Sequence, residues 1–313
     1  IMDNILIIKH GSLGDIVQIS GVLKDIRESY RNSKIFFLTS PMFKSLMDKC
    51  PYIDEVLIDN RKVRWKIMHI FKLKKKLNSY NFSHVFDLQN SKRTEIYRRA
   101  ILNTSNWSSS ITILKNNETK KDFDKLEILE RFKIQMERSG VAAVDSKSPD
   151  FTWAIDNSFE YRNNLSSKYI VLLPFCSKHL PHKKWPYYSE LISKFKKNYP
   201  GIGVLIAPGP GEIDEALNYD AKVILDDNNP TNFFQLSKVL SDSLYVIAND
   251  TGPAHMAAHL GCKGVALFGH HTTSKKVSMK TKNFDILESE DLSKISVDDV
   301  YEKIRLHLRL EDI

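Results

Sequence analysis

Cysteine is scarce in this chain of 313 residues, and its three cysteines lie far apart. Cys50, Cys176 and Cys262 form no Cys-x-x-Cys pair, which argues against a disulfide framework or a structural zinc site and for a reducing compartment. No apolar run approaches the roughly 20 residues that span a bilayer. The first residues also lack the charged start and longer apolar core of a signal peptide. We therefore expect a cytoplasmic protein.

The first half of the chain has few acidic residues relative to its basic residues. Residues 1–150 carry 27 Lys and Arg against 18 Asp and Glu, whereas residues 151–313 carry 19 against 20, so the whole excess of +8 comes from the first half. This imbalance predicts an anionic partner, and nucleic acid, an anionic membrane surface and a phosphorylated glycolipid all fit.

The densest basic segment is Arg61–Lys76, which includes Lys62 and Arg64 and contains no acid. Its apolar residues fall near one helical face. It is either a surface helix whose lysines snorkel or a patch that meets lipid headgroups or phosphates. Nucleic acid is disfavoured, because no aromatic platform or known nucleic-acid-binding motif accompanies the charge.

Short apolar runs alternate with amphipathic helical segments along the chain, which predicts βα units and parallel sheets. In the first half we expect strands at 5–8, 35–39, 56–58 and 85–88, and helices over 16–30, 41–49 and 65–77. After a polar segment at 156–168, the strands are expected at 169–173, 203–206, 223–225, 244–248 and 264–268. The helices there are expected over 187–198, 214–217, 232–240, 253–260 and 297–310. The pattern predicts two Rossmann-like α/β domains, 1–160 and 161–313, that face a cleft.

One strand–helix turn of the second half points most directly to a ligand, and it contains Asn249, Asp250, Thr251, Gly252, Pro253 and His255. Asp250 or Thr251 can cap the helix, and Pro253 suits its first turn. Gly252 lets a ligand come close, and His255 lies within the same turn. The N–H groups and the positive dipole end of such a helix favour an anion, so the turn predicts a phosphate site. A well-capped structural helix is the alternative.

A similar turn follows the first strand and runs from His10 to Asp15 with two glycines. It does not match G-x-G-x-x-G, so it is no dinucleotide fingerprint. Asp15 is expected at the start of a helix, at the carboxyl edge of the sheet where open α/β sheets bind ligands. The carboxylate either acts as a general base toward a hydroxyl or only caps the helix.

Two loops of the second half offer further ligand-binding groups. The basic loop 182–186 contains Lys183 and Lys184, which can neutralise a phosphate unless the loop is merely solvated. The Gly/Pro turn 208–212 ends in Glu212, which can accept hydrogen bonds from ribose hydroxyls or simply begin a helix. Metal is not expected: His255 and His259 are four apart but lack the Glu of H-E-x-x-H, and no third ligand stands out.

Together these residues resemble glycosyltransferase family 9, the heptosyltransferases of lipopolysaccharide core assembly. The resemblance spans nearly the whole chain and rests on the segments 5–17, 183–186, 249–255 and 266–269. It implies a GT-B architecture with an acceptor domain first and a nucleotide-sugar donor domain second. It also implies an inverting transfer without metal or cofactor, usually of heptose from ADP-heptose, to a lipopolysaccharide inner-core acceptor (Kdo-lipid A or heptose) at the inner face of the inner membrane.

Carried over by position, the resemblance makes Asp15 the general base and Lys183 the lysine that holds the donor phosphate. Glu212 resembles an acid near the nucleoside, with Glu215 close by. The loop for the pyrophosphate and sugar is Asp250, Thr251, Gly252, Pro253 and His255. We place Gly14, Lys62 and Arg64 on the acceptor side, and expect the last helix to pack back across the first domain.

The chain departs from the family pattern at a few positions. The family often has Arg where Lys9 stands and Pro where Gly21 stands, and it usually has Pro-Thr where His270-His271-Thr272 follows Gly269. That last loop borders the donor, so a relative that uses another nucleotide sugar is an alternative. A non-catalytic nucleotide- or glycolipid-binding module and a nucleic-acid-binding protein are the alternatives from other classes.

Overall fold

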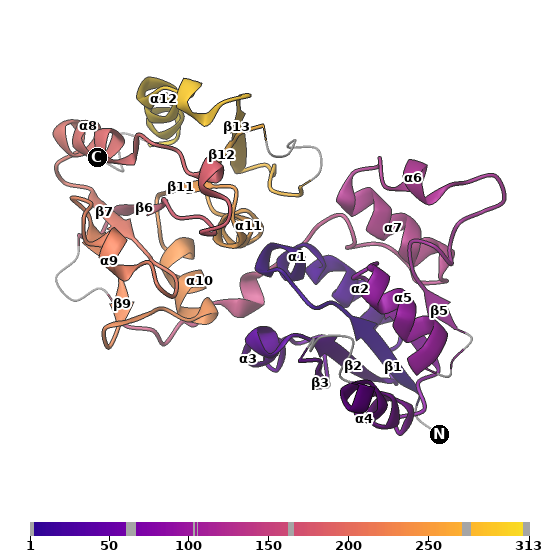
Figure 1. Cartoon of the computed structure of the whole chain (residues 1–313). Helices are drawn as coiled ribbons and strands as arrows, with labels where there is room; N and C mark the ends of the chain where they lie inside the picture. The colour runs from indigo at the N-terminus through magenta and orange to yellow at the C-terminus, as the bar shows by residue number, and fades with distance from the viewer. Residues whose placement is uncertain are drawn as a thin grey trace. The chain divides into compact units, whose positions relative to one another are not determined.

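The computed structural model describes residues 3–60, 67–102, 104, 106–161, 166–270 and 277–308 (Figure 1). The chain divides into two compact units, Ile1–Trp153 and Ala154–Ile313, which we call unit 1 and unit 2. The division lies just ahead of the polar segment 156–168 in which we expected the linker. Among the described residues, no helix is both long enough and apolar enough to cross a bilayer.

Unit 1 is built around a parallel sheet with the strand order β3-β2-β1-β4-β5. The strands are β1 (Asn4–Ile8), β2 (Lys34–Thr39), β3 (Glu55–Ile58), β4 (His84–Asp87) and β5 (Trp107–Ser108). Residues 5–8 of β1 have no exposed surface, as expected for a strand covered on both faces. The order of strands reverses between β1 and β4, and ligands of open α/β sheets bind beyond the carboxyl ends of the strands at such a point.

The helical segments of unit 1 are α1 (Leu13–Gln18), α2 (Ser20–Ser29), η1 (Pro41–Phe43), α3 (Lys44–Met47), α4 (Ile67–Asn78), α5 (Lys92–Ile96), η2 (Tyr97–Ile101), α6 (Lys120–Phe123) and α7 (Ile128–Arg138). The single helix that we predicted over 16–30 is wrong, because the backbone bends at Ile19. There the Ser20 hydroxyl donates to the Val17 carbonyl at 2.8 Å, which competes with regular helix bonding.

Gly21 lets α2 press directly against the loop 145–148. A Cβ atom at Gly21 would lie 2.0 Å from the backbone oxygen of Asp145. One turn further along α2, the buried Asp25 carboxylate accepts hydrogen bonds from the N–H groups of Val144 and Asp145 and from the Ser146 hydroxyl. The close approach explains why this chain has no larger residue at position 21.

Unit 2 contains a second parallel sheet, with the order β13-β12-β11-β6-β7-β8. Its strands are β6 (Tyr169–Leu173), β7 (Gly203–Ile206), β8 (Lys222–Val223), β11 (Tyr245–Asn249), β12 (Gly264–Phe268) and β13 (Phe284–Glu288). The order reverses between β6 and β11. The single strand predicted at 223–225 is wrong. Val223 ends β8, Ile224 belongs to no strand, and Leu225 begins β9 (Leu225–Asp226), which pairs with β10 (Asn229–Pro230) in a separate antiparallel ribbon.

The helical segments of unit 2 are η3 (Thr152–Ala154, at the division), η4 (Pro181–Lys183), α8 (Tyr188–Asn198), α9 (Ile213–Ala216), α10 (Phe233–Ser241), α11 (Gly252–His259), η6 (Leu292–Lys294) and α12 (Val297–His307). α12 buries Val300 and Ile304 completely in the core of unit 2. Its Asp298 pairs with Lys194 of α8. The expected packing of this helix across the first domain stays a prediction.

Candidate active site

The turn after β1 presents the carboxylate of Asp15 at the carboxyl edge of the unit 1 sheet. Asp15 Oδ2 accepts hydrogen bonds from the Ser12 N–H at 2.7 Å and from the Ser12 hydroxyl at 3.0 Å. Its Oδ1 lies 3.5 Å from Lys9 Nζ, and the side chain keeps 42% of its surface exposed. Asp15 therefore caps α1 and remains accessible to a hydroxyl, so the two interpretations of its position are compatible.

Glycine is required at the start of this turn. Gly11 has a φ of +122°, and a Cβ atom there would lie 2.3 Å from Cε2 of Phe43. A side chain at position 11 would push the turn off the ring and displace Ser12. Gly14, which we expected on the acceptor side, is buried within α1 next to Asp15.

A buried cation accompanies Asp15. Lys9, which follows β1, is almost fully buried. Its Nζ donates to the carbonyl of Leu88, which follows the neighbouring strand β4, at 3.1 Å. Burial lowers the pKa of Lys9, although Asp15 acts in the opposite direction. Partial burial alone would raise the pKa of Asp15, but the Lys9 charge and the two Ser12 hydrogen bonds outweigh it, so this pKa lies below its usual value. Asp15 is therefore ionised at neutral pH.

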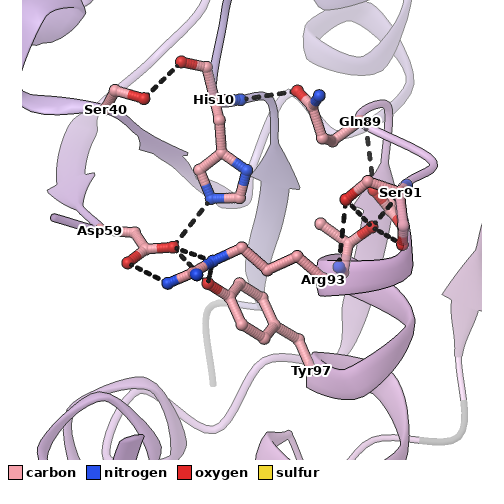
Figure 2. Close-up of polar contacts among 9 residues, drawn as sticks. His10, Ser40, Asp59, Gln89, Ser91, Arg93 and Tyr97 are labelled. Carbon is pink, nitrogen blue, oxygen red and sulfur yellow. Dashed lines mark hydrogen bonds and ion pairs between the residues drawn. The ribbon is translucent and has the colours of Figure 1, made fainter. Parts of the chain in front are cut away.

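Figure 2 shows a polar network that we did not predict, centred on the wholly buried carboxylate of Asp59. Arg93 donates from Nε to Oδ2 at 3.2 Å and from Nη2 to Oδ1 at 3.1 Å, and the Tyr97 hydroxyl donates to Oδ2. His10 Nε2 lies 3.1 Å from the same Oδ2. The signal that could have revealed Asp59 is its place directly after β3, at the same sheet edge as Asp15.

At the carboxyl edge of unit 2, the buried Asn249 side chain at the end of β11 holds the surrounding loops together. Its Oδ1 accepts hydrogen bonds from the Trp185 N–H and the Tyr188 hydroxyl, both at 3.1 Å. Its Nδ2 donates to the carbonyls of Pro174 at 2.9 Å and Phe175 at 3.3 Å. These four bonds tie the end of β11 to the end of β6 and to the start of α8.

The loop held in this way brings two predicted site residues together. Lys183 Nζ donates to Asp250 Oδ2 at 2.8 Å, across 67 positions of sequence. The Asp250 side chain is 7% exposed and that of Lys183 is 20% exposed. A strong charge-assisted bond therefore places one cation at the β11–α11 turn.

The start of α11 has the features of an anion site. Thr251 is the N-cap and Pro253 lies in the first turn, and the Thr251 side chain makes no capping hydrogen bond to the helix. The first turn contains no acid, and His255 is buried within it. Gly252 begins the helix without a side chain in front of its N–H. Such a terminus attracts negative charge.

Glu212 lies at the same sheet edge, after β7, as the N-cap of α9. Its Oε2 accepts a hydrogen bond from the Gly209 N–H at 2.7 Å. Burial raises the pKa of Glu212, and this hydrogen bond only partly opposes the rise. The neighbouring Glu215 pairs instead with Lys184.

The sequence model of glycosyltransferase family 9, the heptosyltransferases, matches residues 70–303, which is more than half of the chain. The chain belongs to glycosyltransferase family 9. It is therefore a glycosyltransferase by family, as we predicted. The matched segment contains the unit 2 residues described above but begins after Asp15, so the role of Asp15 depends on its own geometry.

Named relatives of this family 9 glycosyltransferase agree with the assignment. The lipopolysaccharide core heptosyltransferase OpsX of Haemophilus influenzae is 21% identical over 286 residues, covering 86% of this chain and 79% of that protein. A family 9 glycosyltransferase of Veillonella parvula has a TM-score of 0.76 at 16% identity, with 97% of both chains covered. The heptosyltransferase WaaC of E. coli with ADP has a TM-score of 0.74 at 16% identity, with 97% of this chain and 100% of that chain covered. These likenesses confirm the predicted α/β fold of GT-B type.

Several predicted residues remain to be placed. Lys62, Arg64, His271 and Thr272 lie outside the described residues. His259 is buried and shares a hydrogen bond with Ser278 at 2.9 Å. The part of the chain that the structure describes contains no group of three His, Cys, Asp or Glu side chains suited to a metal ion. His270 follows β12, and its ring lies 5.6 Å from that of His182.

A cavity of about 580 Å³ lies elsewhere in unit 1. Its walls come from β4, β5, the loop after β5 and the end of α7, and they include Trp107, Lys115 and Arg138. Arg138 is already paired with Glu118. The cavity contains none of the predicted site residues, so we do not assign the transfer chemistry to it.

Proposed function

We propose that this enzyme transfers a heptose from ADP-heptose to a lipopolysaccharide inner-core acceptor, Kdo-lipid A or a heptose, with inversion and without metal or cofactor. The relative from H. influenzae is named a lipopolysaccharide core heptosyltransferase. Structures of E. coli WaaC are described with ADP and with ADP-2-deoxy-2-fluoro heptose. The observation that carries the proposal in this chain is the accessible, ionised Asp15 in unit 1 combined with the Lys183–α11 site in unit 2.

Asp15 serves as the general base of the proposed reaction. Its carboxylate takes the proton from the acceptor hydroxyl while that oxygen attacks the anomeric carbon of the donor. The bond from the anomeric carbon to the diphosphate oxygen breaks, and ADP leaves from the opposite face. One displacement with one base gives inversion. We assign this acceptor side to the first domain, 1–160, including Gly14, Lys62 and Arg64.

Unit 2 holds the donor in this proposal. The start of α11 and Lys183 stabilise the negative charge that develops on the leaving diphosphate. Asp250 keeps Lys183 at this position, so the diphosphate shares the ammonium group with that carboxylate. Glu212 accepts hydrogen bonds from ribose hydroxyls, and Thr251, Gly252, Pro253 and His255 surround the diphosphate and sugar. The second domain, 161–313, is thus the donor domain.

A membrane surface fits the basic excess of the first half, and we propose that the enzyme works at the cytoplasmic face of the inner membrane. Helix α4 exposes Lys72, Lys74, Lys75 and Lys76, while Phe71 is 66% exposed beside them. On the opposite face of α4, Leu73 and Leu77 are buried in the core of unit 1. Cations around one exposed aromatic ring suit anionic headgroups. Vesicles with and without anionic lipid test this, because binding should need the anionic lipid and should weaken in Phe71→Ser.

The transfer itself is tested with purified enzyme, Kdo-lipid A and ADP-heptose. We expect a heptosylated product whose anomeric configuration, read by NMR, is inverted relative to the donor, with undiminished rates in EDTA. ADP, UDP and GDP are compared by thermal shift, where a ligand at one hundred times its Kd stabilises by about 2.7 kcal/mol. Retention of configuration, or no preference for any nucleotide, would contradict the proposal.

A donor with another sugar or base is the second candidate, and one observation favours it. His182 and His270 stand together at the edge that carries Lys183 and α11, where the family usually has Pro-Thr after the strand. Two imidazoles offer different hydrogen bonds from a proline. A preference for UDP or GDP over ADP in the same thermal-shift series would select this candidate.

A further inference from the structure

We propose that the buried Asp59–Arg93–Tyr97 network is a positioning device that holds the reactive Asp15 through His10 and the loop His10–Ser12. The inference rests on the proposed role of Asp15 as the general base. None of the network residues is assigned a catalytic step: they act on the loop and not on the substrate.

Asp59 is fixed in position and orientation. Its side chain has no exposed surface, and a buried carboxylate is tolerated only when hydrogen bonds replace its water. Arg93 bonds both oxygens in a bidentate arrangement, which also fixes the plane of the carboxylate. Burial and the nearby Asp59 charge raise the pKa of Tyr97, so its hydroxyl keeps its proton and donates. Asp59 is therefore a rigid point at the sheet edge (Figure 2).

The His10 ring lies against this rigid point, and the His10 backbone is held by two hydrogen bonds to other residues. Its Nε2 lies 3.1 Å from Asp59 Oδ2, its N–H donates to Gln89 Oε1 at 3.0 Å, and its carbonyl accepts from the Ser40 hydroxyl at 2.6 Å. The imidazole is 2% exposed and meets the Tyr97 ring edge-on at 6.1 Å. Neither the backbone nor the ring of His10 can move without breaking one of these contacts.

The position of His10 is passed on to Asp15 within a few residues. Gly11 has no side chain and packs on Phe43, and Ser12 donates both its N–H and its hydroxyl to Asp15 Oδ2. A shift of the loop would therefore weaken the two hydrogen bonds that orient the carboxylate. Lys9, on the other side of His10, is the cation that faces Asp15, and Asp87 and Arg131 are the charged groups that act on Lys9.

The test compares Tyr97→Phe, His10→Ala and His10→Gln with the unmodified enzyme. We expect kcat to fall about 10- to 100-fold in His10→Ala, because a misplacement near 1 Å has a cost of that order, while the donor KM is unchanged. His10→Gln should recover most of the rate, since its amide group fills much of the same space beside Asp59 and can reach the carboxylate. Tyr97→Phe, which loses one donor, should lie between these variants and the unmodified enzyme.

A second readout follows the Asp15 carboxyl carbon by NMR during acid titration. In His10→Ala the Ser12 donors should be misaligned. The pKa of Asp15 should therefore rise toward its usual value of about 3.9. A residue that only stabilised the fold would not move this titration. This readout needs no substrate, and Tyr97→Phe supplies it if His10→Ala does not fold.

Asp25→Asn is the matched control, because Asp25 is another buried carboxylate of unit 1 that holds a loop, at 144–146. We expect it to lower the melting temperature and to leave kcat and the Asp15 titration unchanged. Equal losses of kcat in Asp25→Asn and His10→Ala, or an unmoved Asp15 titration in His10→Ala, would overturn the inference. Full activity in Asp15→Asn would instead overturn the proposed base, and the titration would still decide the inference.

Discussion

In both units a buried strand leads through a turn into a helix at the carboxyl edge of a parallel sheet. The two turns differ in whether an acidic residue lies in the first turn of the helix. After β1, the N–H of Ser12 is taken by the carboxylate of Asp15, which lies in the first turn of α1. After β11, the first turn of α11 contains no acid, and the nearby Asp250 carboxylate is bound to Lys183.

In the proposed mechanism, this difference allows one type of supersecondary structure to serve two chemical tasks. When the acid is part of the helix's first turn, the helix terminus stabilises that acid and presents it outward as an anion. When the acid is drawn aside by a lysine, the terminus can accept an anionic ligand. Substitutions in each turn should separate these two tasks.

Asp15→Asn should remove the outward anion and leave the anion-accepting turn intact. We expect kcat to fall about 10³-fold, within the range attributed to general-base catalysis. The dissociation constant of ADP, measured by calorimetry, should not change. Equal losses of turnover and of ADP affinity would mean that the two turns do not divide the work as described.

Lys183→Met should affect the other turn, and therefore donor binding. Losing a charge-assisted bond to the diphosphate should weaken ADP binding about 30-fold, or ~2 kcal/mol. The folded protein should also be less stable, because the buried Asp250 carboxylate loses its ion pair with Lys183. Calorimetry and thermal melting measure the two effects. Lys184→Met is the control, because its partner Glu215 is 47% exposed and the pair contributes little. Identical results for the two lysines would refute the assignment of Lys183.

Lys9→Met should change the pH dependence of the unit 1 turn. Since the pKa of Asp15 is lowered in the native enzyme, kcat at saturating donor should fall only below the pH at which an ordinary aspartate titrates. Without the Lys9 charge the carboxyl group protonates at a higher pH, so the acid limb should move upward. Lys24→Met, which removes an exposed lysine paired with Asp145, should leave the profile unchanged. An acid limb at the same pH in both variants would count against the Lys9–Asp15 coupling.

Glu212→Gln should give the smallest effect, about a fivefold weaker binding of ADP, because one hydrogen bond to a ribose hydroxyl contributes about 1 kcal/mol. The pKa of Glu212 is raised, so ADP affinity of the unmodified enzyme should begin to weaken at a higher pH than an ordinary glutamate would cause, and this trend should vanish in the variant. Glu215→Gln is the matched control. A larger loss in Glu215→Gln would move the nucleoside contact to that residue.

The sequence predicted the regions in which local pattern determines structure. The apolar runs 5–8, 169–173 and 244–248 are found as the buried strands β1, β6 and β11, and the segments after them contain the predicted Asp15, Lys183 and Asp250, respectively. It did not predict β5, whose two residues are too few to show an alternation of apolar and polar positions. It also did not predict β13, whose middle residues are only half-buried. The predicted 16–30 helix failed because its apolar period continues through the bend at Ile19.

The unpredicted part of the candidate site depends on contacts between distant positions. Asp59 and Tyr97 are 38 residues apart, and neither belongs to a recognisable motif. Their pairing arises only when β3 and the α5–η2 segment reach the same sheet edge. Asn249 was recognised as part of a turn, but its four hydrogen bonds to the end of β6 and the start of α8 could not be inferred from its neighbours in the chain.

The contact at Gly21 has a practical meaning for protein engineers who exchange segments between relatives. The obstacle to a larger residue there is the backbone oxygen of Asp145, which no substitution can remove. A proline or alanine from a relative would fit only if the partner loop came with it. In chimeric enzymes, α2 and the loop 145–148 should therefore be transplanted as a single cassette.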